Sequence, residues 1–203
     1  AGQARDWPST PTPADALRAW QLANPAFYRA SIDLAAARVG MPSSVVWAVA
    51  QTESSWDPRA VSVSDAMGLT QVVPQTALRI AAALGEHYVD GMLFEPYHAI
   101  RYGAWYLAAL REDFGGQLPV AVAAYNAGPV AARTWLRAVA PVPFDEWVES
   151  IAFDQAREYV RRVVVAAVRY EIAYGDGATL VDPALGGIIP FEVASSDAGN
   201  VQF

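Results

Sequence analysis

The segment that decides the fold is WAVAQTESSWDPRAVS, residues 47–62, in which one carboxyl group lies at the end of an apolar helix. Apolar residues such as Val46 and Val49 recur at the helical spacing and do not alternate as in a strand. Pro42 and the serines after it favour a helix start, because proline fits the first turn and a serine oxygen accepts a free backbone N–H. The helix is expected to end before Pro58, since proline disfavours helical backbone at the preceding residue.

Glu53 falls on the same stripe of this helix as Val46 and Val49, in the last turn. Burial disfavours the charged form of a carboxyl group, and the negative end of the helix dipole adds about 0.3–1 kcal/mol in the same direction. This placement predicts a carboxylic acid that stays protonated near neutral pH and can donate a proton to a leaving oxygen. The alternative, from this helix alone, is an ordinary solvated glutamate.

Four further blocks follow or adjoin this helix in a fixed order. They are AMGLTQVVPQTA (66–77), IRYGAWYL (100–107), AAYNAGP (123–129) and WVESIAFDQAREYV (147–160). Together they resemble the soluble lytic transglycosylases, lysozyme-like enzymes that cut the glycan strands of bacterial peptidoglycan. The likeness covers residues 28–174, and four blocks in register carry it where any one alone would be weak.

The resemblance implies a role for particular residues. Glu53 matches the catalytic acid/base of the family, and Ser62 matches a serine that assists the N-acetyl region of the sugar. Gln71 and Tyr125 match residues that line the cleft at the point of cleavage, and Asn126 belongs to the same signature.

In the family, the chemistry is non-hydrolytic. The glutamic acid protonates the β-1,4 oxygen between N-acetylmuramic acid and N-acetylglucosamine, and the resulting carboxylate takes the proton of the muramyl C6 hydroxyl as a 1,6-anhydro ring closes. One carboxyl group serves both halves because it is regenerated within the cycle. The usual glycosidase scheme instead uses two carboxyl groups.

The chain departs from the family pattern at several positions. Gln155 stands where the family commonly has a glutamate, and it is expected, with Tyr159, to contact the substrate. An amide keeps the hydrogen bonding but loses the charge, which would lower the pKa of Glu53. Thr70 and Val73 replace methionines, which suggests altered contacts with the sugar.

Two aspartates could supply a second catalytic carboxyl group. Asp57 precedes a proline and Asp65 lies just before Gly68, and a turn role is favoured for both. Gly68 is expected to allow a backbone turn that directs Gln71 into a groove. Gly128 is expected to end one helix before Pro129 starts the next.

The fold is predicted to be mainly α, a lysozyme-like helical domain, because no interval shows the sustained alternation of a sheet protein. The predicted organisation is an extended leader (1–14), one catalytic domain (15–175) and an irregular tail (176–203). Further helices are predicted over residues 75–84, 96–113, 120–127, 130–138 and 154–174.

Composition excludes several classes of function. The net charge of −7 gives no support for a nucleic-acid partner. Cysteine is absent, and His87 and His98 show no ligand spacing, so neither a metal site nor a cofactor is expected. Seven tryptophans and nine tyrosines suit a sugar groove, although most belong to the core. The better candidates for the groove are Trp56, Tyr102, Tyr106, Tyr125 and Tyr159.

The expected location is the cell envelope, periplasmic or extracellular, because the substrate that the resemblance implies lies there. No stretch of about 18 uncharged apolar residues is present, and the sequence starts at Ala1 without a methionine, as in a mature exported form. A monomer that binds peptidoglycan strands is expected. Two alternatives stay open: a lysozyme-type hydrolase that uses the same Glu53, and a catalytically degenerate peptidoglycan-binding scaffold.

Overall fold

The fold is built almost entirely from α-helices, as the sequence predicts. The computed structural model describes residues 14–139, 141–175 and 188–189. The helices are α1 (Ala14–Ala23), α2 (Arg29–Val39), α3 (Ser43–Ser54), α4 (Pro74–Ala83), α5 (Pro96–Asp113), α6 (Leu118–Ala127), α7 (Pro129–Ala138), α8 (Phe144–Ser150) and α9 (Asp154–Tyr174), with a 3₁₀ turn, η1 (Met92–Phe94).

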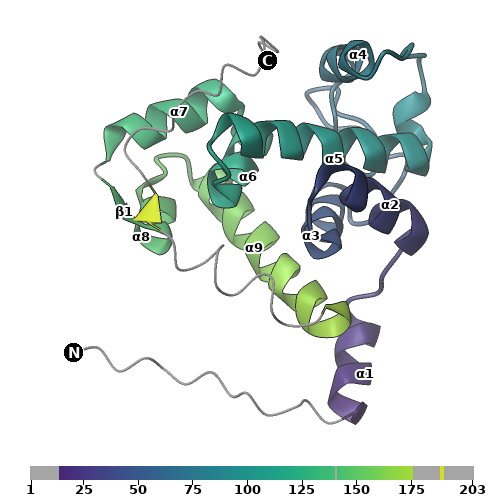
Figure 1. Cartoon of the computed structure of the whole chain (residues 1–203), viewed down its shortest axis with the longest axis horizontal. Coiled ribbons are helices and arrows are strands. Elements are labelled where there is room, and N and C mark those ends of the chain that lie inside the picture. The colour runs from purple at the N-terminus through teal and green to yellow at the C-terminus, as the bar shows by residue number, and fades with distance from the viewer. Residues whose placement is uncertain (1–13, 140, 176–187, 190–203) are drawn as a thin grey trace.

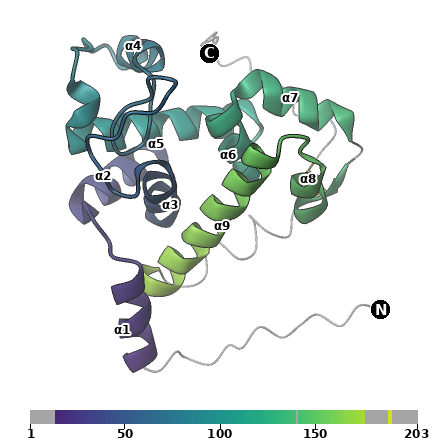
Figure 2. The same cartoon turned by 180° about the vertical axis from the view of Figure 1, so that it is seen from behind.

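Helix α9 is the axis about which the others pack. In Figure 1 it crosses the molecule diagonally, with α1 against its C-terminal end and α8 near its start. Helix α3 makes its most extensive contacts with α9, and the two lie side by side when the molecule is turned round (Figure 2). They are antiparallel, because Trp47 near the start of α3 stacks on Tyr170 near the end of α9, while Glu53 at the end of α3 bonds Tyr159 near the start of α9.

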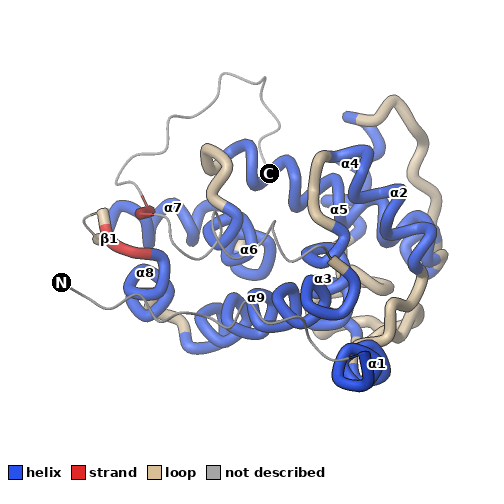
Figure 3. Tube along the Cα trace, turned by 60° about the horizontal axis from the view of Figure 1, so that its bottom comes forward, coloured by secondary structure: helices blue, strands red, loops and turns tan. Residues whose placement is uncertain are grey.

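The buried side chains form two clusters. The larger joins α2, α3, α5, α6, α7, α8 and α9, and α6 is buried along most of its length between α5 and α9. The smaller cluster packs α4 and η1 against the first half of α5; its buried members are Val72, Ala77, Ile80, Ala81, Leu93 and Tyr102. The long connection between α3 and α4, tan in Figure 3, joins the two clusters because Leu69 belongs to the first and Val72 to the second.

The bounds of several helices match the sequence prediction. Helix α3 ends at Ser54, before Asp57-Pro58, and α5 and α9 have the predicted bounds. Gly128, at φ 84°, separates α6 from α7 as expected. Helices α1, α2 and α8 were not predicted: α2 has only a weak apolar stripe among alanines and charged residues, and α1 and α8 are ten and seven residues long.

The tail differs from the prediction at two residues. Ile188 and Ile189 form a short strand, β2 (Ile188–Ile189), antiparallel to β1 (Val142–Pro143), so an irregular tail is wrong at this point. Backbone pairing is the reason, since two strands satisfy each other's N–H and C=O groups. Helix α1 begins at the predicted leader boundary, and the rest of the leader and tail lies outside the described residues.

No single helix of the described residues is long and apolar enough to cross a membrane. The bent pair α2 and α3, at 119° to each other, passes such a test by length and composition.

Candidate functional site

Glu53 lies in the last turn of α3, and the chain turns sharply after it. Ser55 and Trp56 both adopt left-handed backbone, at φ 51° and 71°, which stops the helix. The Ser54 hydroxyl donates to the carbonyls of Ala50 and Leu69, at 3.1 and 3.0 Å. The end of α3 is therefore fixed to the loop that follows it.

Tyr159 holds the Glu53 carboxyl group from α9. Its hydroxyl donates to Glu53 Oε1 at 2.6 Å, and its side chain is almost fully buried. The antiparallel packing of α3 on α9 brings together two residues that are 106 positions apart. The contact therefore brings two of the predicted site residues together.

The pKa of Glu53 is raised from 4.5 to about 7. Burial is the main cause, because it disfavours the charged form. The hydrogen bond from Tyr159 and the positive charge of Arg162 act in the opposite direction and are smaller. The raised pKa agrees with the protonated acid that the sequence predicts.

Tyr125 is the third member of this cluster and comes from the last turn of α6. Its hydroxyl donates to the Thr70 carbonyl at 2.8 Å, and its ring lies 5.1 Å from that of Tyr106. Burial raises the pKa of Tyr125 well above its usual 10, and the nearby Glu53 charge raises it further. Both tyrosines at the acid are therefore neutral hydrogen-bonding groups and not bases.

The loop between α3 and α4 depends on Gly68. Its φ is 72°, and a Cβ atom there would lie 1.8 Å from the Leu93 carbonyl oxygen, so no other residue fits without a shift of the backbone. Gln71 follows at φ 48°, and its Nε2 donates to the carbonyls of Ala60 and Gly68, at 3.1 and 2.9 Å. The predicted turn at Gly68 is confirmed, and the Gln71 amide braces the loop.

Ser62 lies in the same loop with its hydroxyl oxygen already in use. Ser62 Oγ accepts the backbone N–H groups of Ser64 and Ala66, at 3.2 and 3.0 Å. Its own hydroxyl proton is not needed for these bonds. A hydroxyl held in this way can donate to the carbonyl oxygen of a ligand.

Thr70 replaces a methionine of the family and was expected to alter contacts with the sugar, but the structure gives its side chain a different place. Its side chain is fully buried, and Oγ1 donates to the Ala99 carbonyl at 2.6 Å. It packs against Gly103, where a Cβ atom would lie 2.5 Å from Thr70 Cβ. The side chain therefore joins the loop to α5, and only its carbonyl, through Tyr125, touches the cluster.

Two other predicted residues adjoin the tyrosines of this cluster, and a third does not belong to it. Gln155 is exposed in the first turn of α9, one turn before Tyr159, and Asn126 is half-buried beside Tyr125. Tyr102 is fully buried in the smaller core cluster, so its assignment to the sugar groove is wrong. The sequence of residues 100–107 could not show that Tyr102 is buried, because a tyrosine suits both a core and a sugar groove.

The two aspartates have turn roles, as favoured from the sequence. Asp57 Oδ1 accepts the Arg59 N–H at 2.8 Å, and Asp65 is exposed at φ 60°. Arg162 is the residue that sequence reasoning missed. Its spacing of three from Tyr159 on a helix could have identified it.

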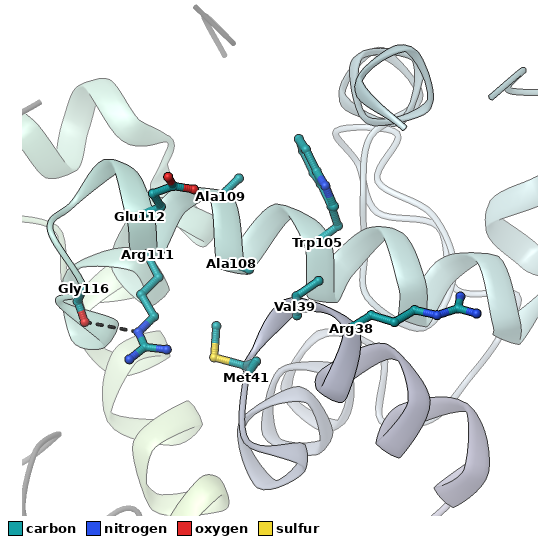
Figure 4. A pocket seen from close by; sticks show the side chains of 9 residues that line it. All are labelled: Arg38, Val39, Met41, Trp105, Ala108, Ala109, Arg111, Glu112 and Gly116. Carbon is teal, nitrogen blue, oxygen red and sulfur yellow. Dashed lines mark hydrogen bonds between the residues drawn. The ribbon is translucent and has the colours of Figure 1, made fainter. Parts of the chain in front are cut away.

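A hollow elsewhere on the surface contains none of the predicted residues. Figure 4 shows it between the end of α2 and the second half of α5, with Val39, Met41 and Ala108 among its lining residues. Its volume is about 460 Å³. A hollow is a usual sign of a ligand site, but here the perturbed carboxyl group at Glu53 is the stronger indication of chemistry.

Comparison with known proteins bears on this geometry. The family described as the transglycosylase SLT domain matches residues 30–148, more than half of the chain and including Glu53, Ser62, Gln71 and Tyr125. The chain belongs to this family. Tyr159, which holds the acid of this SLT domain, lies beyond the matched residues.

Two curated relatives carry related names. The soluble lytic murein transglycosylase of Escherichia coli strain K12 is 35% identical over 144 residues, which cover 70% of this chain and 22% of the relative. A putative soluble lytic murein transglycosylase of Haemophilus influenzae is 33% identical over 161 residues, which cover 76% of this chain and 27% of the relative. This chain therefore spans about a quarter of the length of these relatives.

Solved structures share the fold of this SLT domain. The 70-kDa soluble lytic transglycosylase of Escherichia coli superposes with a TM-score of 0.78 at 31% identity, over 84% of this chain and 28% of that one. An inactive mutant of the lytic transglycosylase Slt from Pseudomonas aeruginosa gives 0.72 at 36% identity, over 74% and 25%. The predicted mainly α, lysozyme-like fold is confirmed.

Proposed function

We propose that this chain is a peptidoglycan lytic transglycosylase in which Glu53 is the single general acid/base. The observation that carries the proposal is the Glu53 carboxyl group, buried at the end of α3 with a pKa of about 7 and held by Tyr159. The names of the relatives and of the solved neighbours support the same activity.

The first half of the reaction needs a protonated acid. With a pKa of about 7, Glu53 is protonated in about half of the molecules at pH 7 and can still give up its proton readily. It donates that proton to the β-1,4 oxygen between N-acetylmuramic acid and N-acetylglucosamine as the bond from muramyl C1 breaks. The Tyr159 hydroxyl donates to the carboxylate that this step leaves behind.

The second half needs a base at the same place. The Glu53 carboxylate takes the proton from the muramyl C6 hydroxyl, and the C6 oxygen bonds to C1 to close the 1,6-anhydro ring. The proton lost in the first half is regained in the second, so no water is consumed. The acid is ready for another cycle.

The surroundings of Glu53 favour this scheme over one with two carboxyl groups. The side chains that shift the pKa of Glu53 by hydrogen bonding or charge are Tyr159 and Arg162, and neither is a carboxylate. A second acid would lie about 5–9.5 Å away in the usual glycosidase arrangement. Asp57 and Asp65 are used in turns instead.

The remaining predicted residues would bind the sugar. The free hydroxyl proton of Ser62 suits the carbonyl oxygen of the substrate N-acetyl group. Gln71 and Tyr125 border the same loop and would line the cleavage point, with Asn126 beside Tyr125. Gln155 would contact the strand from the first turn of α9, as an exposed amide without charge.

The proposal extends to the setting of the domain. Residues 15–175 would form the catalytic domain, flanked by the leader and the tail. Its partner would be the glycan strands of the cell envelope, in the periplasm or outside the cell, and it would act as a monomer.

The test is mass analysis of purified peptidoglycan digested by the parent chain and by Glu53→Gln. Anhydromuropeptides from the parent and none from the variant are expected. Glutamine keeps the size and hydrogen bonding of the side chain but cannot donate or accept the catalytic proton. Reducing-end products from the parent would instead make it a hydrolase. Binding to the strands without any product would leave a scaffold.

A further inference from the structure

Arg162 differs from the neighbouring arginines of α9 because it forms no ion pair with any described residue. Arg157 pairs with Asp154, and Arg161 pairs with both Glu149 and Glu158. Within the described part of the chain, no carboxylate lies within ion-pairing distance of Arg162, which is exposed. Its guanidinium is therefore available to a ligand.

The position of Arg162 is fixed by the helix that carries it. It lies three residues after Tyr159, which places the two on one side of α9 about 4.5 Å apart along the axis. Tyr159 holds Glu53, and the positive charge of Arg162 acts on both of these groups. An exposed cation thus lies at the edge of the buried acid.

Glu53 provides no negative charge beside Arg162 during the acid step, because it must be neutral when it donates its proton. Among the described residues, no other carboxylate forms an ion pair with Arg162. The chain as a whole carries −7 and would repel an anionic polymer. The positive charge of Arg162 would offset that repulsion close to the bond that is cleaved.

We propose that Arg162 binds a carboxylate carried by the muramyl side of the glycan strand and so selects muramyl strands over neutral ones. The inference rests on the proposed function and names a specificity residue for it. Two sources have this chemistry: the lactyl carboxylate, which is free in strands without peptides, and the carboxylates of the stem peptides. Guanidinium and carboxylate match in charge and in their paired hydrogen bonds.

The test measures binding in the Glu53→Gln background, by calorimetry, with and without Arg162→Gln. This background prevents turnover and removes any effect of Arg162 through the charge of Glu53. The three ligands are peptide-free glycan strands, peptide-bearing strands and neutral N-acetylglucosamine oligomers. Arg169→Gln is the matched control, because Arg169 is exposed on α9 about 15 Å from Tyr159 along the axis.

Arg162→Gln is expected to weaken binding of a carboxylate-bearing strand about threefold to tenfold and to leave the neutral oligomers unchanged. Loss with peptide-free strands identifies the lactyl carboxylate, and loss with peptide-bearing strands alone identifies the stem peptide. Arg162→Lys, which keeps the charge, should recover part of the affinity. Arg169→Gln should change none of the three.

Equal weakening for all three ligands, or for none, would overturn the inference. The proposed function fails differently, since the parent chain would then yield no anhydro product from any strand.

Discussion

The two ends of the α3–α9 pair differ in burial and in chemistry, because Trp47 is fully buried whereas Glu53 keeps some exposure to solvent. Near the start of α3, Trp47 stacks on Tyr170 with ring centroids 5.4 Å apart, and its indole N–H bonds the Phe27 carbonyl. Near the end of α3, Glu53 meets the hydroxyl of Tyr159. One end is apolar and stabilises the domain, and the other places an ionisable group out of water.

This difference shows how one helix pair provides both rigidity and reactivity. Burial of Trp47 contributes to stability because it removes apolar surface from water. Burial of Glu53 lowers the stability of the fold whenever the carboxyl group is charged. The same loss of contact with water raises the pKa of Glu53. The aromatic end therefore stabilises the packing of the two helices, and the polar end carries the ionisable group.

Glu53→Gln should have the largest effect, because it changes the polar end and leaves the aromatic end of the helix pair intact. We expect the rate of strand cleavage to fall about 10⁴-fold, because in the proposed mechanism one group serves as both acid and base. The fold should persist, since Gln is nearly isosteric. Initial rates of muropeptide release, with circular dichroism to check the helices, measure both. A loss of less than tenfold would contradict the central role of Glu53.

Trp47→Ala should remove the aromatic packing near the start of α3. We expect the free energy of unfolding to fall by about 4 kcal/mol through lost burial and a cavity. The rate per folded molecule should stay within about threefold of the parent, because Trp47 lies six residues from Glu53. Denaturant unfolding and active-site titration measure these effects. Val165→Ala, on the exposed face of α9, is the control, with an expected change within about 0.5 kcal/mol.

The stability of the parent should depend on pH through Glu53. Its pKa is 4.5 in an ordinary setting and about 7 when folded, so folding takes up a proton between these values. The stabilisation from the protonated group is fully present below pH 4.5 and is lost as pH rises through 7, by about 3 kcal/mol in all. The measurement is the free energy of unfolding of the parent and of Glu53→Gln between pH 4 and 9. A difference between the two that does not change with pH would contradict the raised pKa of Glu53.

Tyr159→Phe should have a smaller effect at the polar end. The lost hydrogen bond had lowered the pKa of Glu53, so the alkaline limb of the activity profile should move to higher pH. The rate near pH 7 should fall about tenfold as the acid loses its position. Tyr102→Phe is the matched control, because the Tyr102 hydroxyl is buried without a hydrogen-bond partner among the described residues. An equal effect of both substitutions would mean that the contact at Glu53 is only structural.

The sequence predicted the parts of the fold that depend on local pattern. Helix α3 could be bounded from its apolar period and from Pro58, and the raised pKa followed from the stripe that includes Glu53. The turn at Gly68 was expected, but its close approach to the Leu93 carbonyl was not. That contact joins residues far apart in the chain and has no signature in a single segment.

The missing parts depend on tertiary contacts. Helix α2 buries Ile32, Ala35 and Ala36 against its neighbours, a stripe too weak to recognise among alanines. Thr70 looked like a contact for the sugar, and its buried bond to the Ala99 carbonyl depends on the path of α5. The position of Arg162 near Glu53 depends on the packing of α9 against α3.

The most direct test of the account is a titration of the Glu53 carboxyl carbon by NMR in the folded chain. The midpoint is expected near pH 7, because burial outweighs the opposing effects of Tyr159 and Arg162. In Trp47→Phe the midpoint should stay there, since the aromatic end is kept. A midpoint close to 4.5 would contradict the claim that the fold holds this acid in its proton-donating form.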